Sequence, residues 1–134
     1  MSRIMIIDDD EDVLTTLRVL LKSEGHTVIP MTDGLEAMEH LRSLERIDLL
    51  LVDLRMAPVD GMELIRTARE TRPDMPVVVV SAYLDDNSIR RIQQMGCKGY
   101  IHKPFTAEKV VEQVQSILAE TGQLYLGDEE PPPA

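Results

Sequence analysis

The sequence predicts an α/β fold in which five parallel strands form one sheet and five helices cover both of its faces. Short apolar runs rich in β-branched residues alternate with longer amphipathic runs along most of the chain. This alternation is typical of βα units, whose right-handed crossovers build a parallel sheet. The third and fourth short runs, at residues 47–52 and 77–80, are almost continuously apolar. Strands that are buried on both faces of a sheet have that composition.

Five segments have the composition of strands. The four consecutive valines at 77–80 are the strongest of these signals, because β-branched side chains favour the extended backbone. Pro73 and Pro76 bracket the turn that leads into them. The expected strands are residues 3–7, 27–30, 47–52, 77–80 and 99–102.

The helices are indicated by one apolar face and by their ends. Residues 13–21 and 110–118 both carry apolar side chains at positions i, i+1, i+4, i+7 and i+8, the spacing of a half-buried helix. Gly25 and Gly96 end the helices before them, and Thr106 caps the last one. The other helices are expected from Asp33, which has capping-box spacing to Glu36, through about Leu44, over the segment with Gly61, Leu64, Ile65 and Ala68, and over 86–95.

Length, charge and cysteine content limit the possible classes of protein. The 134 residues suit one domain, expected over 1–121, followed by an acidic, proline-rich tail or linker at 122–134. The net charge of −10 disfavours direct binding to nucleic acid or to an anionic membrane. No stretch suits a membrane span or a signal peptide, and a single cysteine excludes an internal disulfide framework. The expected location is the cytoplasm.

Chemically useful side chains gather at one edge of the predicted sheet. The first strand is followed by Asp8 and Asp9, the third by Asp53, the fourth by Ser81 and the fifth by Lys103. The carboxyl ends of parallel strands share one edge, and ligands of such sheets bind there. We therefore expect these side chains to form one site.

The residue types at this edge agree with phosphoryl chemistry. Neighbouring carboxylates raise one another's pKa, and a hard divalent cation relieves that repulsion. Mg²⁺ prefers one or two carboxylates together with water and phosphate oxygens. A carboxylate beside the ion can attack a phosphoryl group and become an acyl phosphate. Lys103 and Ser81 are of the right type to stabilise the charge that develops.

Five short segments occur in order along the chain: Ile6-Ile7-Asp8-Asp9-Asp10, Val52-Asp53-Leu54-Arg55-Met56, Asp60-Gly61-Met62-Glu63-Leu64, Val80-Ser81-Ala82 and Lys103-Pro104-Phe105. Taken together, these segments resemble the receiver domain of bacterial response regulators, the CheY-like family. The resemblance covers residue 3 to about residue 120. It implies a flavodoxin-like doubly wound sheet with strand order 2-1-3-4-5, and a two-component phosphorelay function with Mg²⁺ as cofactor.

The resemblance also implies a role for each acid of the site. Asp53 would accept a phosphoryl group from the phosphohistidine of a partner kinase. Asp9 would bind Mg²⁺ directly and Asp8 mainly through water. Asp53 and the backbone carbonyl of Arg55 would complete the protein's share of the metal shell.

The resemblance implies roles for three further residues, of which Lys103 and Ser81 would contact the bound phosphate. Lys103 would pair with it, and Ser81 would form a hydrogen bond to it and move on activation. Tyr100 would be an aromatic switch that turns inward when Ser81 moves. The family also has a cis peptide before the proline, so Lys103–Pro104 is a candidate for that isomer.

The sequence departs from the family pattern in the loop after the acceptor. The run is Met56-Ala57-Pro58, with proline one place later than usual, while the spacing from Asp53 to Gly61 is kept. We expect a changed loop and an intact site. Arg55 and Tyr83 lie two residues past the acceptor and the hydroxyl, where side chains of the family control the access of water. Both are large, and the hypothesis is that they shield the acyl phosphate and slow dephosphorylation.

Taken singly, the same residues have simpler explanations. Residues 8–10 could cap the next helix, and Asp10 is expected to do so. Lys103 could be an ordinary surface lysine, and Tyr100 a packing residue. The methionines are expected to fill the core. The remaining expectations are a partly buried Cys97 with no redox role, a His102 that points away from the site, and surface positions for His26 and His40.

Two other functions are weighed against the phosphoacceptor. Dehalogenase-like phosphohydrolases also use a strand-end aspartate with Mg²⁺, but they carry a second acid where this chain has Arg55. A pseudo-receiver would bind partners without phosphorylation, which the complete set of site residues disfavours.

The expected partners are a sensor histidine kinase or a phosphotransfer protein, while the output is open. The domain docks onto a downstream protein or passes phosphate along a relay, or else the tail begins a linker to an output domain. The expected docking surface is the fourth helix, fifth strand and fifth helix beside Tyr100. Leu124-Tyr125-Leu126 could extend that surface or support a phosphorylation-dependent dimer.

Overall fold

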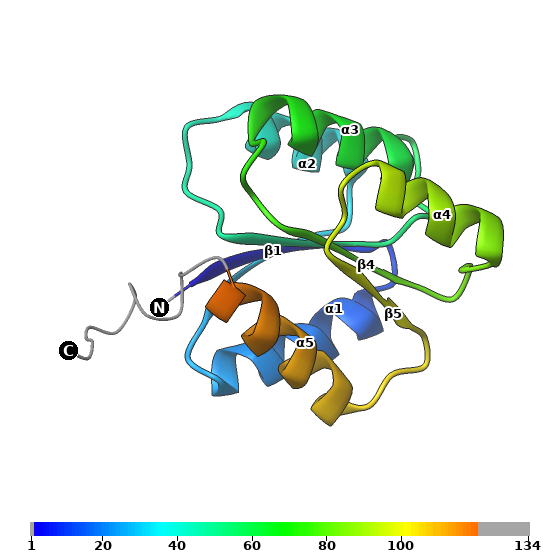
Figure 1. Cartoon of the computed structure of the whole chain (residues 1–134). Coiled ribbons are helices and arrows are strands. Elements are labelled where there is room, and N and C mark those ends of the chain that lie inside the picture. Colours follow the sequence, from blue (N-terminus) through cyan, green and yellow to red (C-terminus); the bar gives the residue numbers. More distant parts are fainter. Residues whose placement is uncertain (1, 121–134) are drawn as a thin grey trace.

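The computed structural model describes residues 2–120, in which five strands alternate with five helices (Figure 1). The predicted tail at 122–134 lies outside the described residues. None of the described helices is both long and apolar enough to cross a membrane. The elements are β1 (Arg3–Ile7), α1 (Glu11–Ser23), β2 (Thr27–Met31), α2 (Gly34–Arg42), β3 (Leu49–Val52), α3 (Gly61–Thr71), β4 (Val77–Ser81), α4 (Asp86–Gln94), β5 (Gly99–His102) and α5 (Ala107–Glu120).

All five strands are parallel and lie in the order β2-β1-β3-β4-β5, which confirms the predicted doubly wound fold. The chain reverses its direction of travel across the sheet between β1 and β3. Ligands of open α/β sheets bind outside the carboxyl ends of the strands at that reversal. The residues that follow β1 and β3 are Asp8 and Asp53.

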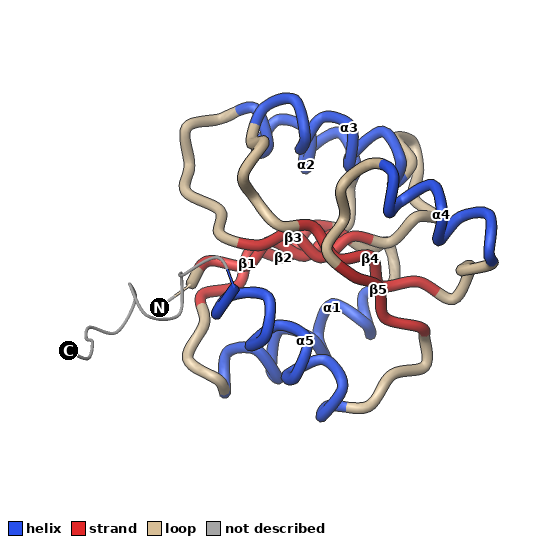
Figure 2. Tube along the Cα trace, viewed as in Figure 1, coloured by secondary structure: helices blue, strands red, loops and turns tan. Residues whose placement is uncertain are grey.

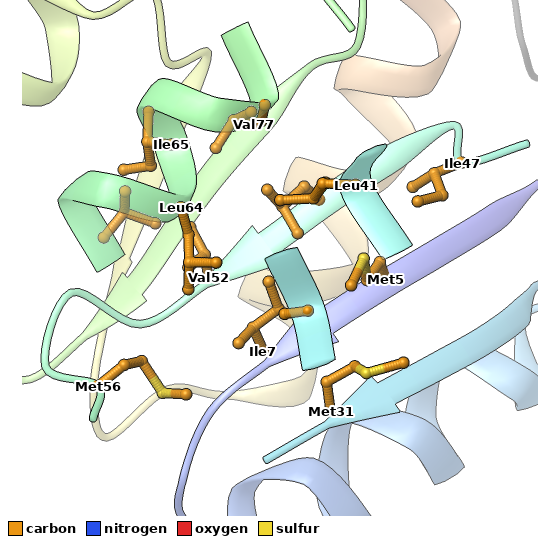
Figure 3. Packing of buried hydrophobic residues seen from close by; sticks show 14 of the residues in the cluster. Met5, Ile7, Met31, Leu41, Ile47, Val52, Met56, Leu64, Ile65 and Val77 are labelled. Carbon is orange, nitrogen blue, oxygen red and sulfur yellow. The ribbon is translucent and has the colours of Figure 1, made fainter. Parts of the chain in front are cut away.

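Two apolar layers hold the helices to the sheet, because neighbouring strand residues face opposite sides. Helices α2, α3 and α4 cover one face, and α1 and α5 cover the other (Figures 1 and 2). Met5 and Ile7 point into the first layer, while Ile4 and Ile6 point into the second. Figure 3 shows part of the first layer, to which Leu64 and Ile65 of α3 and Val52 of β3 all contribute.

Methionines form part of the first apolar layer, as expected for core residues. Met5, Met31, Met56 and Met75 are all buried in it, and Met56 reaches the layer from the loop after β3 (Figure 3). An unbranched side chain adapts to such positions. That loop therefore packs against the core through Met56 and does not project from the molecule.

Helix ends follow the predicted capping pattern, except that the structure shows no capping box between Asp33 and Glu36. Asp10 caps α1 by accepting from the amides of Asp12 and Val13. Asp33 caps α2 through the amide of Leu35, and a reciprocal capping box forms at α4 between Asp85 and Ser88. Thr106 Oγ1 accepts from the amide of Lys109 at 3.2 Å, which opens α5.

The surface position expected for His26 is wrong. His26 is 8 % exposed, because the turn at Gly25 carries it back beneath α1 and its amide donates to Leu21 O at 3.1 Å. Burial lowers the pKa of its imidazole, and nearby Glu24 only partly opposes this. His40 is partly exposed, as is Cys97, whose thiol pKa burial raises to about 11.

The third strand is shorter than predicted at its start. It begins at Leu49, two residues after the expected Ile47. The Asp48 carboxylate accepts from Arg3 N at 2.8 Å and pairs with Arg46 at 3.2 Å. The buried Asp48 carboxylate thus satisfies the Arg3 amide at the amino end of the sheet.

Candidate functional site

The floor of the site is a lysine held between two buried carboxylates. Lys103 Nζ lies 2.6 Å from Asp8 Oδ2 and 2.9 Å from Asp53 Oδ2. Asp8 and Asp53 are 2 % and 5 % exposed. The ends of the first, third and fifth strands therefore meet, as the sequence predicted.

Sheet hydrogen bonds continue past the strands and place these side chains. The amide of Asp8 donates to Met31 O at 3.1 Å. The amide of Asp53 donates to Ile7 O at 3.0 Å. The residue after each strand is thus still held by the ladder, so its side chain has a defined direction at the sheet edge.

Gly61 lets α3 begin directly against the backbone of the predicted acceptor. A Cβ atom at position 61 would lie 2.2 Å from the carbonyl oxygen of Asp53 and 2.5 Å from Leu54 Cα. The Gly61 amide donates to Leu54 O at 2.9 Å. No local pattern in the sequence signals this contact, since it depends on how the loop folds back on the strand end.

Burial is the largest influence on the charges of the site. It raises the pKa of Asp8, and hydrogen bonds from Lys103 and from the Asp10 amide only partly offset that rise. Burial alone would lower the pKa of Lys103, but hydrogen bonds to Asp8 and Asp53 outweigh it and raise the pKa of the ammonium. Lys103 is therefore a fixed cation at neutral pH, and the Asp8 carboxylate is destabilised by its burial.

Three acids are placed so that they could share a metal ion. Asp8, Asp9 and Asp53 each offer one carboxylate oxygen, and these oxygens lie within 4.8 Å of one another. Asp9 is exposed, so the cluster opens to solvent on its side. A donor set of oxygens alone suits a hard divalent cation. Such an ion would also favour the ionised form of Asp8, so the residues present fit the predicted cofactor.

Ser81 is buried at the same edge, where its hydroxyl holds the loop after β4. It is 0 % exposed, and its Oγ accepts from the amide of Tyr83 at 3.1 Å. The hydroxyl therefore links the end of β4 to the backbone of the loop that leads into α4.

Tyr100 lies half-buried on β5 and packs against the apolar layer beneath α4. Its ring meets the exposed ring of His102 edge-on, with centroids 6.2 Å apart. This position agrees both with simple packing and with the switch expected for Tyr100.

Arg55 and Tyr83 form a contact that spacing alone does not reveal. The Arg55 guanidinium carbon lies 4.0 Å from the centre of the Tyr83 ring, the geometry of a cation–π contact. The Arg55 amide donates to Asp53 Oδ1 at 3.1 Å, so the stack starts directly beside the predicted acceptor. The loops after β3 and β4 are joined across the site by this pair.

The chain matches the family model described as response regulator receiver domain over residues 4–115. The chain belongs to this family. As a receiver domain it is a component of two-component signalling, not an enzyme in the ordinary sense. The predicted fold and the predicted family are therefore both confirmed.

Curated relatives of two lengths are similar to this receiver domain. Response regulator MprA of Mycobacterium ulcerans is 36 % identical over 121 residues, covering 89 % of this chain and 51 % of that protein. The polar-differentiation response regulator DivK of Brucella anthropi is 32 % identical over 127 residues, covering 93 % of this chain and 96 % of that protein. The chain thus spans about half the length of the MprA relatives and nearly all of DivK.

Solved structures show the same fold. A CheY-like receiver domain protein from Methanospirillum hungatei has a TM-score of 0.87 at 27 % identity, covering 92 % of this chain and 98 % of that one. The BeF₃-activated receiver domain of DrrB has a TM-score of 0.81 at 25 % identity, covering 89 % of this chain and 98 % of that one.

Proposed function

We propose that this receiver accepts a phosphoryl group on Asp53. The observation that carries the proposal is Lys103 held between Asp8 and Asp53, with Asp9 within metal-sharing reach of both acids. An oxygen of the Asp53 carboxylate attacks the phosphorus of a phosphohistidine, and an O–P bond forms as the P–N bond breaks. The electron pair of that bond leaves with the imidazole of the donor.

The metal ligands follow from the same cluster. Asp9, Asp53 and the backbone carbonyl of Arg55 are the proposed direct ligands, and Asp8 acts mainly through water. When bound, Mg²⁺ neutralises charge on the phosphoryl oxygens. Lys103 supplies a second positive charge that needs no reorganisation, since it is already fixed beside Asp53.

The proposed switch begins at Ser81. Its hydroxyl now accepts from the Tyr83 amide, and a hydrogen bond to the new phosphoryl group would draw it away from that contact. The loop after β4 would then move, which gives the half-buried ring of Tyr100 room to turn inward. This movement changes the face formed by α4, β5 and α5, where an output partner would read it.

A groove beside Lys103 is the proposed docking place for the phosphoryl donor. It has a volume of about 390 Å³ and lies between the start of α1 and the loop after β5. Its position next to the site would let a donor histidine reach Asp53. Its lining residues are Asp12, Val13, Thr16, Ala82, Lys103, Pro104 and Phe105.

A sensor histidine kinase or a phosphotransfer protein is the proposed donor, with the cytoplasm as the proposed location. Two outputs are proposed. The match spans nearly all of DivK, which favours a receiver that docks onto a partner or relays phosphate. The match spans only half of MprA, which favours an attached output domain. A phosphorylation-dependent dimer is a third proposal.

The test is the intact mass of the protein after incubation with acetyl phosphate and Mg²⁺. We expect a gain of one phosphoryl mass in the wild type and none in Asp53→Asn, with EDTA preventing the gain. A wild type that gains no mass, under conditions that modify a known receiver, would contradict the proposal. The chain would then be a pseudo-receiver whose binding does not depend on phosphorylation.

A further inference from the structure

A groove between α5 and β5 ends at the last described residue. It has a volume of about 510 Å³ and runs beside Tyr100. Gly99 contributes to its floor without a side chain, since a Cβ there would lie 2.8 Å from Gln113 Oε1. The Gln113 amide in turn donates to Tyr100 O at 3.0 Å. The lining residues are Lys98, Gly99, Tyr100, Lys109, Glu112, Gln113, Ser116, Ile117 and Glu120.

We propose that this groove binds the chain's own Leu124-Tyr125-Leu126 segment and the acids that follow it. The segment is apolar and begins four residues after Glu120, with Gly122 between them to permit a reversal. Three acids then follow in a row, Asp128-Glu129-Glu130. The proposed occupant is therefore joined by a short stretch of chain to Glu120, which lines the groove.

The length of chain fits this placement. Lys109 and Glu120 lie at opposite ends of the groove, about 16 Å apart along a helix that rises about 1.5 Å per residue. An extended chain advances about 3.3 Å per residue, so about five residues cover that distance. A segment that turns back at Gly122 therefore places the apolar triplet over the middle of the groove and the acids beside Lys109.

The charged residues at the two ends of the groove favour the same orientation of the segment. Lys98, at the near end of the groove, pairs with Glu120 at 3.7 Å. Lys109, at the far end, is exposed and its ammonium pairs with no acid among residues 2–120. The three consecutive acids of the segment would meet Lys109 there, on the same surface as Glu112.

The sheet topology makes this a side-chain contact and not a sixth strand. Helix α5 lies on the face that also carries α1. A right-handed crossover beyond β5 would need its helix on the face that carries α3 and α4. The segment therefore contacts α5 and the floor of the groove without extending the β-ladder.

The docked segment would cover the groove beside Tyr100 and so block that face in the unphosphorylated protein. Release on phosphorylation rests on the proposed function, because it requires Tyr100 to turn inward and change the groove. The docking itself does not require phosphorylation.

Amide hydrogen exchange of the full chain without phosphate tests the docking. We expect residues 98–101 and 112–118 to exchange several-fold faster in Leu124→Asp/Leu126→Asp than in the wild type. Gln123→Asp is the matched control, since it adds charge to the segment and keeps its apolar side chains. Equal exchange in the wild type and the double variant would overturn the proposal.

Charge reversal tests the direction of docking. Lys109→Glu should speed exchange at the same residues, and Asp128→Lys/Glu129→Lys in the same chain should restore protection. Failure of this restoration would overturn the placement of the acids beside Lys109. Protection that rises with protein concentration, together with a dimer mass by light scattering, would replace the intrachain segment by one from a second copy and overturn the proposal.

The final measurement adds acetyl phosphate and Mg²⁺ and follows mass and exchange in one sample. A phosphoryl mass gain with loss of protection is the expected result. A mass gain with unchanged protection would overturn the release while leaving the phosphoacceptor intact. No mass gain would refute the phosphoacceptor, and with it the release, while the exchange of the unphosphorylated variants still decides the docking.

Discussion

Asp8 is a buried carboxylate that the fold holds at a cost in stability. Its side chain is nearly inaccessible, and a hydrogen bond from Lys103 does not fully compensate for the loss of water. Its raised pKa means that the folded state prefers the protonated acid. The stability that the protonated form of Asp8 contributes is therefore present below the ordinary pKa of an aspartate. It is lost as the pH rises through the raised pKa of Asp8 in the folded protein.

Asp8→Asn should consequently stabilise the protein at neutral pH. The amide keeps an acceptor for Lys103 and removes the buried charge, so we expect a gain of about 1 kcal/mol, or a few degrees in Tm. Added Mg²⁺ should raise Tm in the wild type and much less in the variant. Asp10→Asn is the control, because asparagine caps a helix as well as aspartate does. A lower Tm for Asp8→Asn in the absence of metal would refute this explanation.

The stack of Arg55 on Tyr83 should lengthen the life of the acyl phosphate. The Tyr83 ring and the Arg55 guanidinium join the loops after β3 and β4 beside Asp53, where we expect hydrolytic water to approach. Replacing both residues by alanine should speed dephosphorylation severalfold, because it would open the approach of water to the acyl phosphate. The decay of phosphoryl mass after removal of the donor measures this rate. Arg66→Ala, on the exposed face of α3, is the control, and decay no faster in the double variant would exclude a shielding role.

At the scale of elements, the site depends on how tightly α3 begins against the strand end. Gly61 is the first residue of α3, and its amide bonds back to Leu54. The start of the helix is therefore packed directly on the backbone of Asp53 and Leu54. A change at the helix start should be felt at the site even though it touches no charged group.

Gly61→Ala should both destabilise the fold and impair phosphorylation. The added methyl group would overlap the Asp53 carbonyl, which a buried backbone cannot avoid by a side-chain rotation. We expect a loss of about 2–4 kcal/mol in denaturant unfolding and slower phosphorylation in the fraction that remains folded. Arg66→Ala in the same helix should change the unfolding free energy by less than about 0.5 kcal/mol. Normal stability and normal phosphorylation together would show that the backbone adjusts.

Helix α2 is tied to α3 by one guanidinium. Arg72 follows α3 and donates to the carbonyls of Leu41 at 3.0 Å, His40 at 3.1 Å and Ser43 at 3.0 Å. These are carbonyl groups at the end of α2, where a cation is favoured by the helix dipole. A planar fork can serve several carbonyls at once, which a lysine cannot. The contact also links the α2–β3 loop to the rest of the molecule.

For the whole molecule, the buried His26 couples stability to mild acid. Its imidazole is neutral in the fold because burial lowers its pKa, and its Nδ1 has no hydrogen-bond partner among the described residues. The stability that the neutral imidazole of His26 contributes is present above the ordinary histidine pKa of about 6.5. It is lost as the pH falls below that pKa and through the lowered pKa of His26 in the folded protein.

His26→Leu should flatten the loss of stability between about pH 7 and pH 5. Urea unfolding at several pH values measures the slope, and we expect it to be smaller in the variant than in the wild type. His102→Leu is the control, because His102 is exposed on β5. An unchanged slope in His26→Leu would assign the acid sensitivity to other groups.

The order and type of the elements were readable from the sequence because each signal is local. Alternating apolar runs, glycine stops and capping residues act within a few positions, and so the five strands and five helices were predicted correctly. The site was readable because a parallel sheet brings the carboxyl ends of its strands to one edge. Asp8, Asp53, Ser81 and Lys103 could be named on that ground without any distance.

Only the tertiary structure decided the contacts between segments far apart in the chain. It placed Lys103 between Asp8 and Asp53, stacked Arg55 on Tyr83 and packed Gly61 against the backbone of Asp53. It also corrected His26, since a polar residue after a glycine turn gives no local sign of the helix above it. The physical reason is the range of each interaction, because backbone preferences act within a few residues while burial and ion pairing depend on which surfaces meet.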